Sequence, residues 1–152
     1  MARTPKPDPP TVLCDTREQA PLIMPSVQRA TLATGDYSLE GLADVIAVER
    51  KSLADLAMCV GRERERFERE LERLARMPYP ALVVEASMAD ILLGAARSEV
   101  HPHAVIGSLV SWSVRFRIPV WLCTGRREAA AITYKILLKA LEAHTRQLPE
   151  NE

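Results

Sequence analysis

Short apolar runs alternate with helical apolar patterns along most of this chain. Short apolar runs that are bounded by turn residues are typical of strands. We therefore predict strands over 11–14, 37–39, 45–51, 81–85 and 119–123, with a further possible strand within 27–32. The run that begins at Val45 contains no polar residue before Glu49, so its first half should lie deep inside a sheet.

Amphipathic stretches separate these strands. A helix should begin at Ser52, whose spacing to Asp55 is that of a capping box, and should break near Gly61. A second helix should then run to about residue 77, because Pro78 cannot continue it. The remaining predicted segments are a helical turn at 88–93, a loop over 94–102, and helices over 103–117 and 127–146. This order of elements predicts an α/β sandwich, in which helices cover the faces of a mixed sheet.

The composition is that of a soluble protein with one domain. The 152 residues are 47% apolar and 26% charged, which suffices for one substantial core. We expect a disordered proline-rich arm over 1–10, one domain over 11–147 and a tail over 148–152. No apolar run is long enough to cross a bilayer and the start lacks the apolar core of a secretory signal, so we expect a cytoplasmic protein without a membrane partner.

Cysteine spacing and net charge narrow the chemistry further. Cys14, Cys59 and Cys123 are widely spaced, which is typical of buried thiols in a reducing compartment and not of a zinc site. Positive and negative side chains balance to a formal net charge of zero. Any contact with nucleic acid must therefore use a local basic patch.

The stretch from residue 35 to 55 carries the strongest chemical signal. Glu49 and Lys51 stand two apart at the end of a strand, so their side chains project from the same face. Asp36 can join them if its own strand pairs beside theirs. A Mg²⁺ or Mn²⁺ ion between the two carboxylates would relieve the cost of burying them. Lys51 could then orient a water or offset charge on a phosphate, which is the equipment for metal-assisted phosphodiester hydrolysis.

More carboxylates surround this signal. Asp15 and Glu18 follow the first predicted strand and extend the cluster to four carboxylates and one lysine. Grouping so many like charges is costly, so we favour a metal site over a separate turn cap and ion pair. The capping spacing of Asp55 explains that residue without chemistry. Glu85 ends a strand and either faces the site or meets a helix N-terminus, and we leave it outside the catalytic set.

Arginines recur at helical spacing after the predicted break. They are Arg62, Arg66, Arg69, Arg73 and Arg76. One interpretation is a ladder that grips DNA phosphates. The other is a solvated helix face with its own ion pairs, because Glu65 and Glu72 stand four residues before Arg69 and Arg76. We favour the DNA role for Arg62 and Arg66, and the solvated face for Arg73 and Arg76.

These motifs together match a known pattern. Its elements here are Asp15-x-x-Glu18, Gly35-Asp36, Glu49-Arg50-Lys51 followed by Asp55, Arg66-Phe67, and the strand that ends at Glu85. Through them, residues 11 to 145 resemble the nuclease domain of XPF-type structure-specific endonucleases, a branch of the restriction-endonuclease-like PD-(D/E)XK superfamily. The form resembles compact stand-alone versions in bacteria and phages, since the helicase and tandem helix-hairpin-helix modules common in the family are missing from this sequence. Glu70 stands near the place where the family usually has a glutamine.

The resemblance implies a restriction-endonuclease-like three-layer sandwich and a site for Mg²⁺ or Mn²⁺. It implies that Asp36, Glu49 and the Arg50 carbonyl hold the ion, with Glu18 or Asp15 as further ligands, and that Lys51 is catalytic. We expect DNA contacts from arginines at and beside this site, namely Arg17, Arg50, Arg62, Arg66 and Arg69.

The resemblance also implies function and assembly. We expect a DNA endonuclease that leaves a 5′-phosphate and prefers forks, flaps or other branched duplexes in repair or recombination. We expect a homodimer through the apolar faces of 103–117 and 127–146. The alternative is a catalytically silent pseudo-nuclease that binds DNA or a partner, but such a protein would lack acidic ligands that this sequence retains.

Overall fold

A mixed sheet runs through the centre of the molecule. The computed structural model describes residues 2–94 and 99–149, so parts of the predicted loop 94–102 and of the tail 148–152 lie outside the described residues. Within the described residues, six strands form one sheet in the order β2-β1-β3-β4-β5-β6. The strands are β1 (Val12–Asp15), β2 (Val27–Ala30), β3 (Tyr37–Leu39), β4 (Ile46–Ser52), β5 (Tyr79–Glu85) and β6 (Val120–Leu122). Every predicted strand is therefore present, including the one in 27–32.

The direction of β3 brings the predicted site together. β3 runs antiparallel to both of its neighbours, β1 and β4, whereas β4, β5 and β6 are parallel. Gly35, just before β3, has φ +78°, and a Cβ there would lie only 3.1 Å from the Ala47 side chain. Glycine thus allows the chain to pack closely on β4. The amide of Asp36 then donates to the Val48 carbonyl at 2.9 Å, which sets Asp36 beside Glu49.

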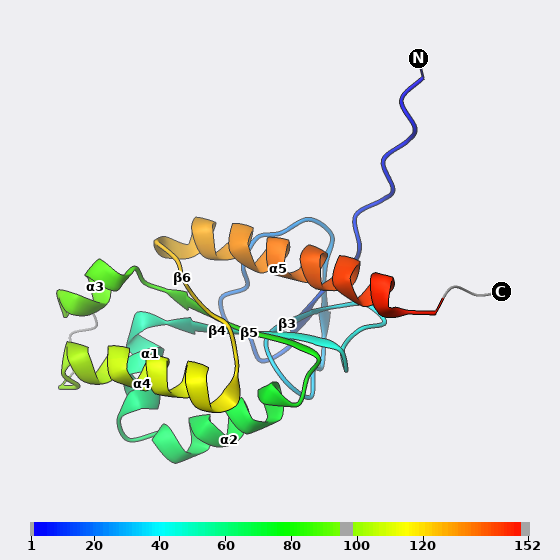
Figure 1. Cartoon of the computed structure of the whole chain (residues 1–152). Coiled ribbons are helices and arrows are strands. Elements are labelled where there is room, and N and C mark those ends of the chain that lie inside the picture. Colours follow the sequence, from blue (N-terminus) through cyan, green and yellow to red (C-terminus); the bar gives the residue numbers. More distant parts are fainter. Residues whose placement is uncertain (1, 95–98, 150–152) are drawn as a thin grey trace.

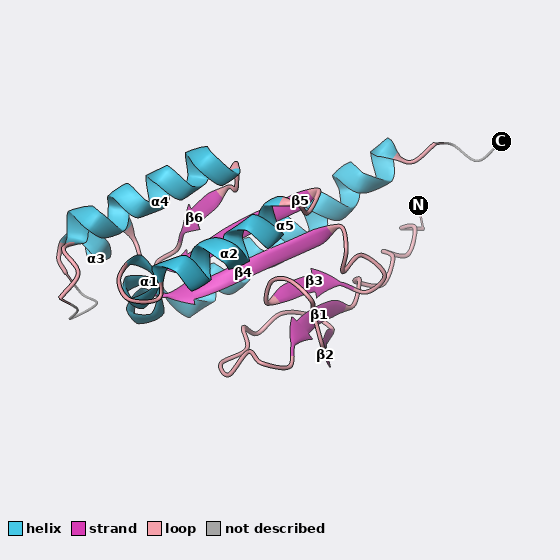
Figure 2. Cartoon of the chain, turned by 90° about the horizontal axis from the view of Figure 1, so that it is seen from below, coloured by secondary structure: helices cyan, strands magenta, loops and turns pink. Residues whose placement is uncertain are grey.

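Helices cover both faces of this sheet (Figure 1). They are α1 (Leu53–Val60), α2 (Arg64–Ala75), α3 (Met88–Leu92), α4 (Pro102–Phe116) and α5 (Gly125–Gln147). The long α5 crosses one face alone, and α1, α2 and α4 lie on the other; Figure 2 shows α2 lying along β4. This is the predicted three-layer sandwich with a restriction-endonuclease-like fold. None of the helices in the described part of the chain is long and apolar enough to cross a membrane.

The alternation of side chains along the central strands divides the core in two. Ala47 of β4 belongs to the cluster beneath α1, α2 and α4. Its neighbours Ile46 and Val48 belong to the cluster beneath α5. Because the period is two, the same alternation sends Glu49 and Lys51 toward α2 and Arg50 toward α5.

Element boundaries differ from the predictions at a few places that matter for the site. The Ser52 hydroxyl accepts a hydrogen bond from the Asp55 amide at 3.2 Å, so Ser52 caps α1 as predicted. α2 begins at Arg64, so Arg62 lies in the turn before the helix and does not continue its arginine stripe. α5 begins two residues earlier than predicted, at Gly125, and so includes Arg126.

Candidate active site

A polar pocket of about 270 Å³ opens on the α2 side of the sheet. Its lining residues are Asp15, Arg17, Ala33, Thr34, Gly35, Asp36, Glu49, Lys51, Arg66, Glu70 and Arg73. The three residues with the strongest chemical signal, Asp36, Glu49 and Lys51, therefore meet in one cavity, as the strand pairing required.

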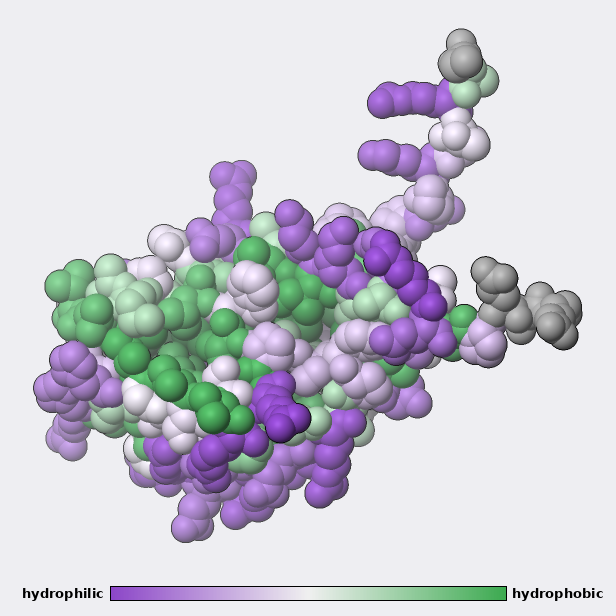
Figure 3. All heavy atoms as spheres, in the orientation of Figure 1, coloured by the Kyte–Doolittle hydropathy of each residue, from purple (hydrophilic) through white to green (hydrophobic). Residues whose placement is uncertain are grey.

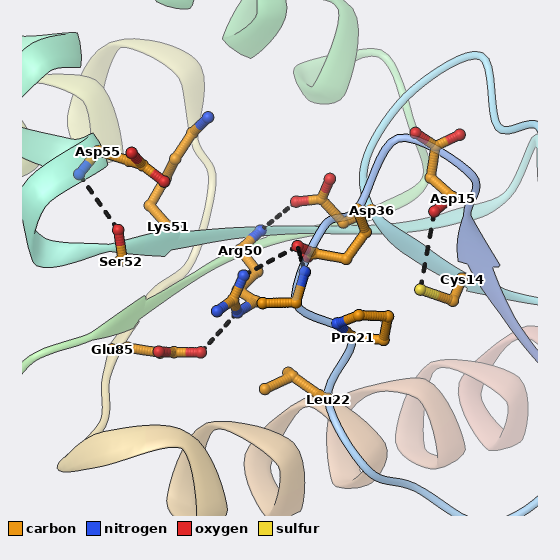
Figure 4. Close-up of polar contacts among 12 residues, drawn as sticks. Cys14, Asp15, Pro21, Leu22, Asp36, Arg50, Lys51, Ser52, Asp55 and Glu85 are labelled. Carbon is orange, nitrogen blue, oxygen red and sulfur yellow. Dashed lines mark hydrogen bonds and ion pairs between the residues drawn. The ribbon is translucent and has the colours of Figure 1, made fainter.

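Short contacts fix these three side chains. The Lys51 Nζ lies 3.3 Å from Glu49 Oε1 and 5.0 Å from the centroid of the Phe67 ring, so α2 contributes a cation–π contact to the lysine. The Arg50 amide donates to Asp36 Oδ2 at 2.8 Å. Figure 4 shows Lys51 leaving β4 on the side opposite to Arg50 and Glu85.

The electrostatics of the two carboxylates favour a cation between them. Burial raises the pKa of Glu49, and the Asp36 carboxylate raises it further. Burial also raises the pKa of Asp36, with a contribution from Glu18, although the Arg50 amide opposes this. Burial works to lower the pKa of Lys51, but Glu49 and other nearby acids outweigh it and the pKa is raised. Lys51 therefore stays an ammonium at neutral pH, able to donate hydrogen bonds and offset negative charge but not to accept a proton.

The donor set fits a hard divalent ion. Asp36 and Glu49 offer two neighbouring buried carboxylates, and the main-chain N–H of Arg50 is bonded to Asp36. Mg²⁺ is commonly held by one or two carboxylates and keeps several waters. Among the described residues, no group of three His, Cys, Asp or Glu side chains is arranged to hold a metal. The fit thus rests on two carboxylates and solvent.

Glu18 and the Arg50 side chain lie outside the pocket. The Arg50 guanidinium is on the α5 face, where Nη1 lies 3.0 Å from Glu18 Oε1 and Nε lies 2.5 Å from Glu85 Oε1. The Arg50 side chain is only 9% exposed. The structure therefore does not place Glu18 with the proposed ligands, and it leaves the buried Arg50 side chain no access to DNA. For Arg50 the physical reason is strand alternation along β4; Glu18 lies in the loop after β1.

Asp15 lines the pocket, but both of its carboxylate oxygens already accept hydrogen bonds from other groups of the protein. Oδ2 accepts from Arg17 Nε at 2.7 Å, and Oδ1 accepts from the Leu32 amide at 2.9 Å. Burial works to raise the pKa of Asp15, yet the Arg17 and Leu32 hydrogen bonds prevail and lower it. Arg17 also donates to the Leu32 carbonyl at 2.7 Å and remains largely exposed at the pocket rim. The pair thus orders the loop that forms one wall.

Two residues of α2 line the pocket although the sequence analysis left them out of the site. Arg73 stands seven residues, or two helical turns, after Arg66, so both reach the same cavity. Glu70 lies between them, and its Oε1 is 3.7 Å from Arg66 Nε. Arg69 is exposed on the same helix but does not line the pocket. The spacing from Arg66 was the signal that could have identified Arg73.

Metal-free protein should lose stability as the pH rises. The folded-state pKa values are raised to about 6 for Asp36 and about 8 for Glu49, whereas unfolded carboxyls titrate near about pH 4. The folded chain therefore holds protons that the unfolded chain has released. Their stabilising effect is complete below about pH 4 and is lost as the pH rises through about 6 and 8. Urea unfolding in chelator across this range measures the loss.

Two comparisons give this pH prediction its controls. Glu49→Gln should remove most of the loss near the upper end of the range, because a neutral amide cannot ionise. Added Mg²⁺ should also reduce it, because the cation favours the charged carboxylates. An unfolding free energy that stays flat or increases over this range in chelator would contradict the assignment of a strained carboxylate pair.

Comparisons with known proteins agree with the motifs and the fold. The ERCC4 domain model matches residues 15–136. XPF from Aeropyrum pernix has a similar structure, with a TM-score of 0.72 at 20% identity over 94% of this chain and 67% of that chain. XPF from the same organism in complex with DNA gives a TM-score of 0.66 at 21% identity over 93% and 68%. None of the curated protein sequences matches this chain. The chain has the fold of these XPF structures, and because the family match spans most of the sequence, the chain belongs to the ERCC4 domain family.

Proposed function

We propose that the protein is a metal-dependent DNA endonuclease that cuts branched duplexes. The observation that carries this proposal is the meeting of Asp36, Glu49 and Lys51 in one polar pocket, beneath arginines of α2. Two buried carboxylates, a held ammonium and a basic rim are what phosphodiester hydrolysis needs. Membership in the ERCC4 domain family supports the same reaction class.

The residues divide the chemical work. Asp36, Glu49 and the Arg50 carbonyl would hold Mg²⁺ or Mn²⁺, which when bound supplies a Lewis acid for a phosphate oxygen and lowers the pKa of a coordinated water. Lys51, held by Glu49 and Phe67, donates a hydrogen bond to the attacking water or to the phosphate. Its fixed position means that no large reorganisation accompanies the build-up of charge in the transition state. Asp15 and Arg17 keep the adjoining loop in place.

Similarity supports DNA as the substrate. One of the similar XPF structures is a complex with DNA. In this chain, Arg17, Arg66 and Arg73 stand at the pocket, where they can bind phosphates on either side of the cut. We assign branch preference to the enzyme from its family, because the pocket chemistry itself would suit any phosphodiester.

Cleavage of end-labelled fork, flap and plain duplex DNA tests the proposal. Each substrate is incubated with Mg²⁺, with Mn²⁺ and with chelator. We expect metal-dependent cutting that ranks the branched substrates above the plain duplex. Binding without cutting in either metal would instead identify a pseudo-nuclease.

Arg73→Gln should weaken binding to fork DNA several-fold and reduce the salt dependence by about one ion equivalent, as expected for a lost phosphate contact. Anisotropy titrations in Ca²⁺ over a salt series measure both. Arg76→Gln is the matched control, because Arg76 is exposed at the end of the same helix but does not line the pocket. Equal effects of the two changes would remove Arg73 from the DNA-binding set.

We further propose a homodimer through the outer face of α4. Val110 and Val114 are 58% and 72% exposed. Beside them, apolar side chains of α3, α4 and β6 line a groove of about 240 Å³, and Figure 3 shows the apolar surface that gathers there. The apolar stripe of α5 packs largely on the chain's own sheet, so α4 carries this proposal. Light scattering should give twice the 16.9 kDa chain mass, and Val114→Arg should give a monomer.

A further inference from the structure

A second polar cluster lies on the α5 face, opposite the pocket. It contains two acids and two arginines, namely Glu18, Arg50, Glu85 and Arg126. Arg50 is held by Glu18 at 3.0 Å and by Glu85 at 2.5 Å. The side chains of these three are each at least nine-tenths buried. Arg126 Nη1 completes the cluster 3.7 Å from Glu85 Oε1. The four charges balance, which makes their burial tolerable.

The cluster also fixes the loop between β1 and β2. Arg126 Nη2 donates to the carbonyls of Ala20 and Pro21, at 2.9 and 2.8 Å. The Tyr37 hydroxyl donates to Glu18 at 3.4 Å and accepts from the amide of Leu22 at 2.7 Å. Arg126 thereby joins the first turn of α5 to this loop and to Glu85 at the end of β5. Glu85 in turn pairs with the Arg50 guanidinium, as Figure 4 shows.

We propose that Glu85 and Arg126 are positioning residues for the metal site, an inference that rests on the proposed function. They act through Arg50, whose amide donates to Asp36 Oδ2 at 2.8 Å and whose carbonyl is a proposed metal ligand. We call Glu18, Glu85 and Arg126 the Arg50 clamp. Glu49 and Lys51 flank Arg50 in the same strand, so the main chain that the clamp holds also positions these two pocket residues.

The physical reason is that Arg50 is charged, buried and pulled from two sides. In a region of low dielectric, moving a guanidinium away from its paired carboxylates is costly, so the carboxylates determine its position. Without the charge of Glu85, Glu18 is the one carboxylate in the described part of the chain that still pairs with the Arg50 guanidinium, and the end of β4 can shift. Arg126 pairs with the Glu85 carboxylate and donates hydrogen bonds to the carbonyls of residues 20 and 21. Loss of Arg126 therefore leaves Glu85 less firmly positioned against Arg50. Outer contacts of this kind typically change metal affinity by about 10- to 100-fold.

The first measurement is Mn²⁺ affinity by calorimetry. Glu85→Gln should raise the Kd for Mn²⁺ about 10-fold, and Arg126→Gln should raise it in the same direction by a smaller factor. Arg126→Lys should recover part of the loss, because it restores the charge beside Glu85. Glu128→Gln and Arg127→Gln are matched controls on α5, because both side chains are exposed and should leave the affinity unchanged.

The second measurement needs no metal. Amide hydrogen exchange should become faster at Arg50, whose N–H is bonded to Asp36, and at Leu22, whose N–H is bonded to Tyr37. Leu109→Ala provides a stability-matched control, since Leu109 is buried in the other core, beneath α4. It should lower the melting temperature without a selective change at these two amides or in Mn²⁺ affinity.

The outcomes separate this inference from the proposed function. Normal Mn²⁺ affinity and normal exchange in both Glu85→Gln and Arg126→Gln overturn the clamp, even if the wild-type protein cuts DNA. A wild-type protein that binds no Mn²⁺ overturns the proposed function, and exchange at Arg50 and Leu22 then decides on the clamp by itself. If Glu85→Gln fails to fold, the partly exposed Arg126 still gives the answer.

Discussion

Glu49→Gln should reduce the rate of metal-dependent DNA cleavage on the order of 1,000-fold while leaving the fold intact. The side chain keeps its size and one oxygen but loses the charge that the metal needs. Glu49 is largely buried beside Asp36 and Lys51, so solvent cannot compensate for the lost negative charge at the metal. Asp36→Asn should act in the same way, because it removes the other carboxylate of the pair. Single-turnover cleavage at saturating protein measures both.

Asp44→Asn is the control for this charge loss. Asp44 is exposed in the turn before β4 and does not line the pocket, so its variant should cut at the wild-type rate. Circular dichroism and unfolding in chelator should show that the Glu49 variant is folded and no less stable than the wild type. Normal cleavage by Glu49→Gln or by Asp36→Asn would show that the metal lies elsewhere.

Trp112→Ala should destabilise the protein by about 3–5 kcal/mol, the range for removing a buried aromatic side chain. Trp112 of α4 is 1% exposed and meets the Phe67 ring at 5.1 Å. Its indole N–H donates to Glu68 at 3.0 Å, and Arg64 lies over its ring at 5.1 Å. Its loss would leave a cavity between α2 and α4 and would remove one hydrogen bond from Glu68, which Arg64 and Arg115 still contact. Urea unfolding measures the effect.

The chain's other tryptophan provides the comparison. Trp121 on β6 is 47% exposed, so Trp121→Ala should cost less than half as much, because less apolar surface is returned to water. Trp112→Ala should also weaken DNA binding through Arg66 and Arg73, since α2 loses its support. If the two alanine variants are equally stable, Trp112 does not hold the junction between α2 and α4.

Local patterns predicted the architecture well, because strands and helix caps depend on interactions between residues that are close in the sequence. Each strand was predicted from an apolar run between turn residues. Ser52 was predicted as the cap of α1 from a contact within four residues. The period of two along β4 placed Glu49 and Lys51 on one face without any knowledge of the fold. These features depend on the backbone and on neighbouring side chains alone.

Local patterns did not show on which face a residue lies once strands and helices have packed. Glu18 follows β1 in the sequence like Asp15, yet only Asp15 lines the pocket while Glu18 pairs with Arg50 beneath α5. Arg73 was assigned to a solvated face because charge-patterned helix faces are usually exposed; it is exposed, and it also lines the pocket. In the structure α2 runs along β4 (Figure 2), so both Arg66 and Arg73 line the pocket.

By itself, the sequence determined the strand and helix order, the pairing of Glu49 with Lys51, and the family motif. Only the tertiary structure decided that Asp36 lies beside Glu49, through the antiparallel β3 and the close approach at Gly35. It also decided that Arg50 serves the opposite face, between Glu18 and Glu85. The physical reason is that local periodicity orients a side chain relative to its own strand, whereas its partners come from segments far along the chain.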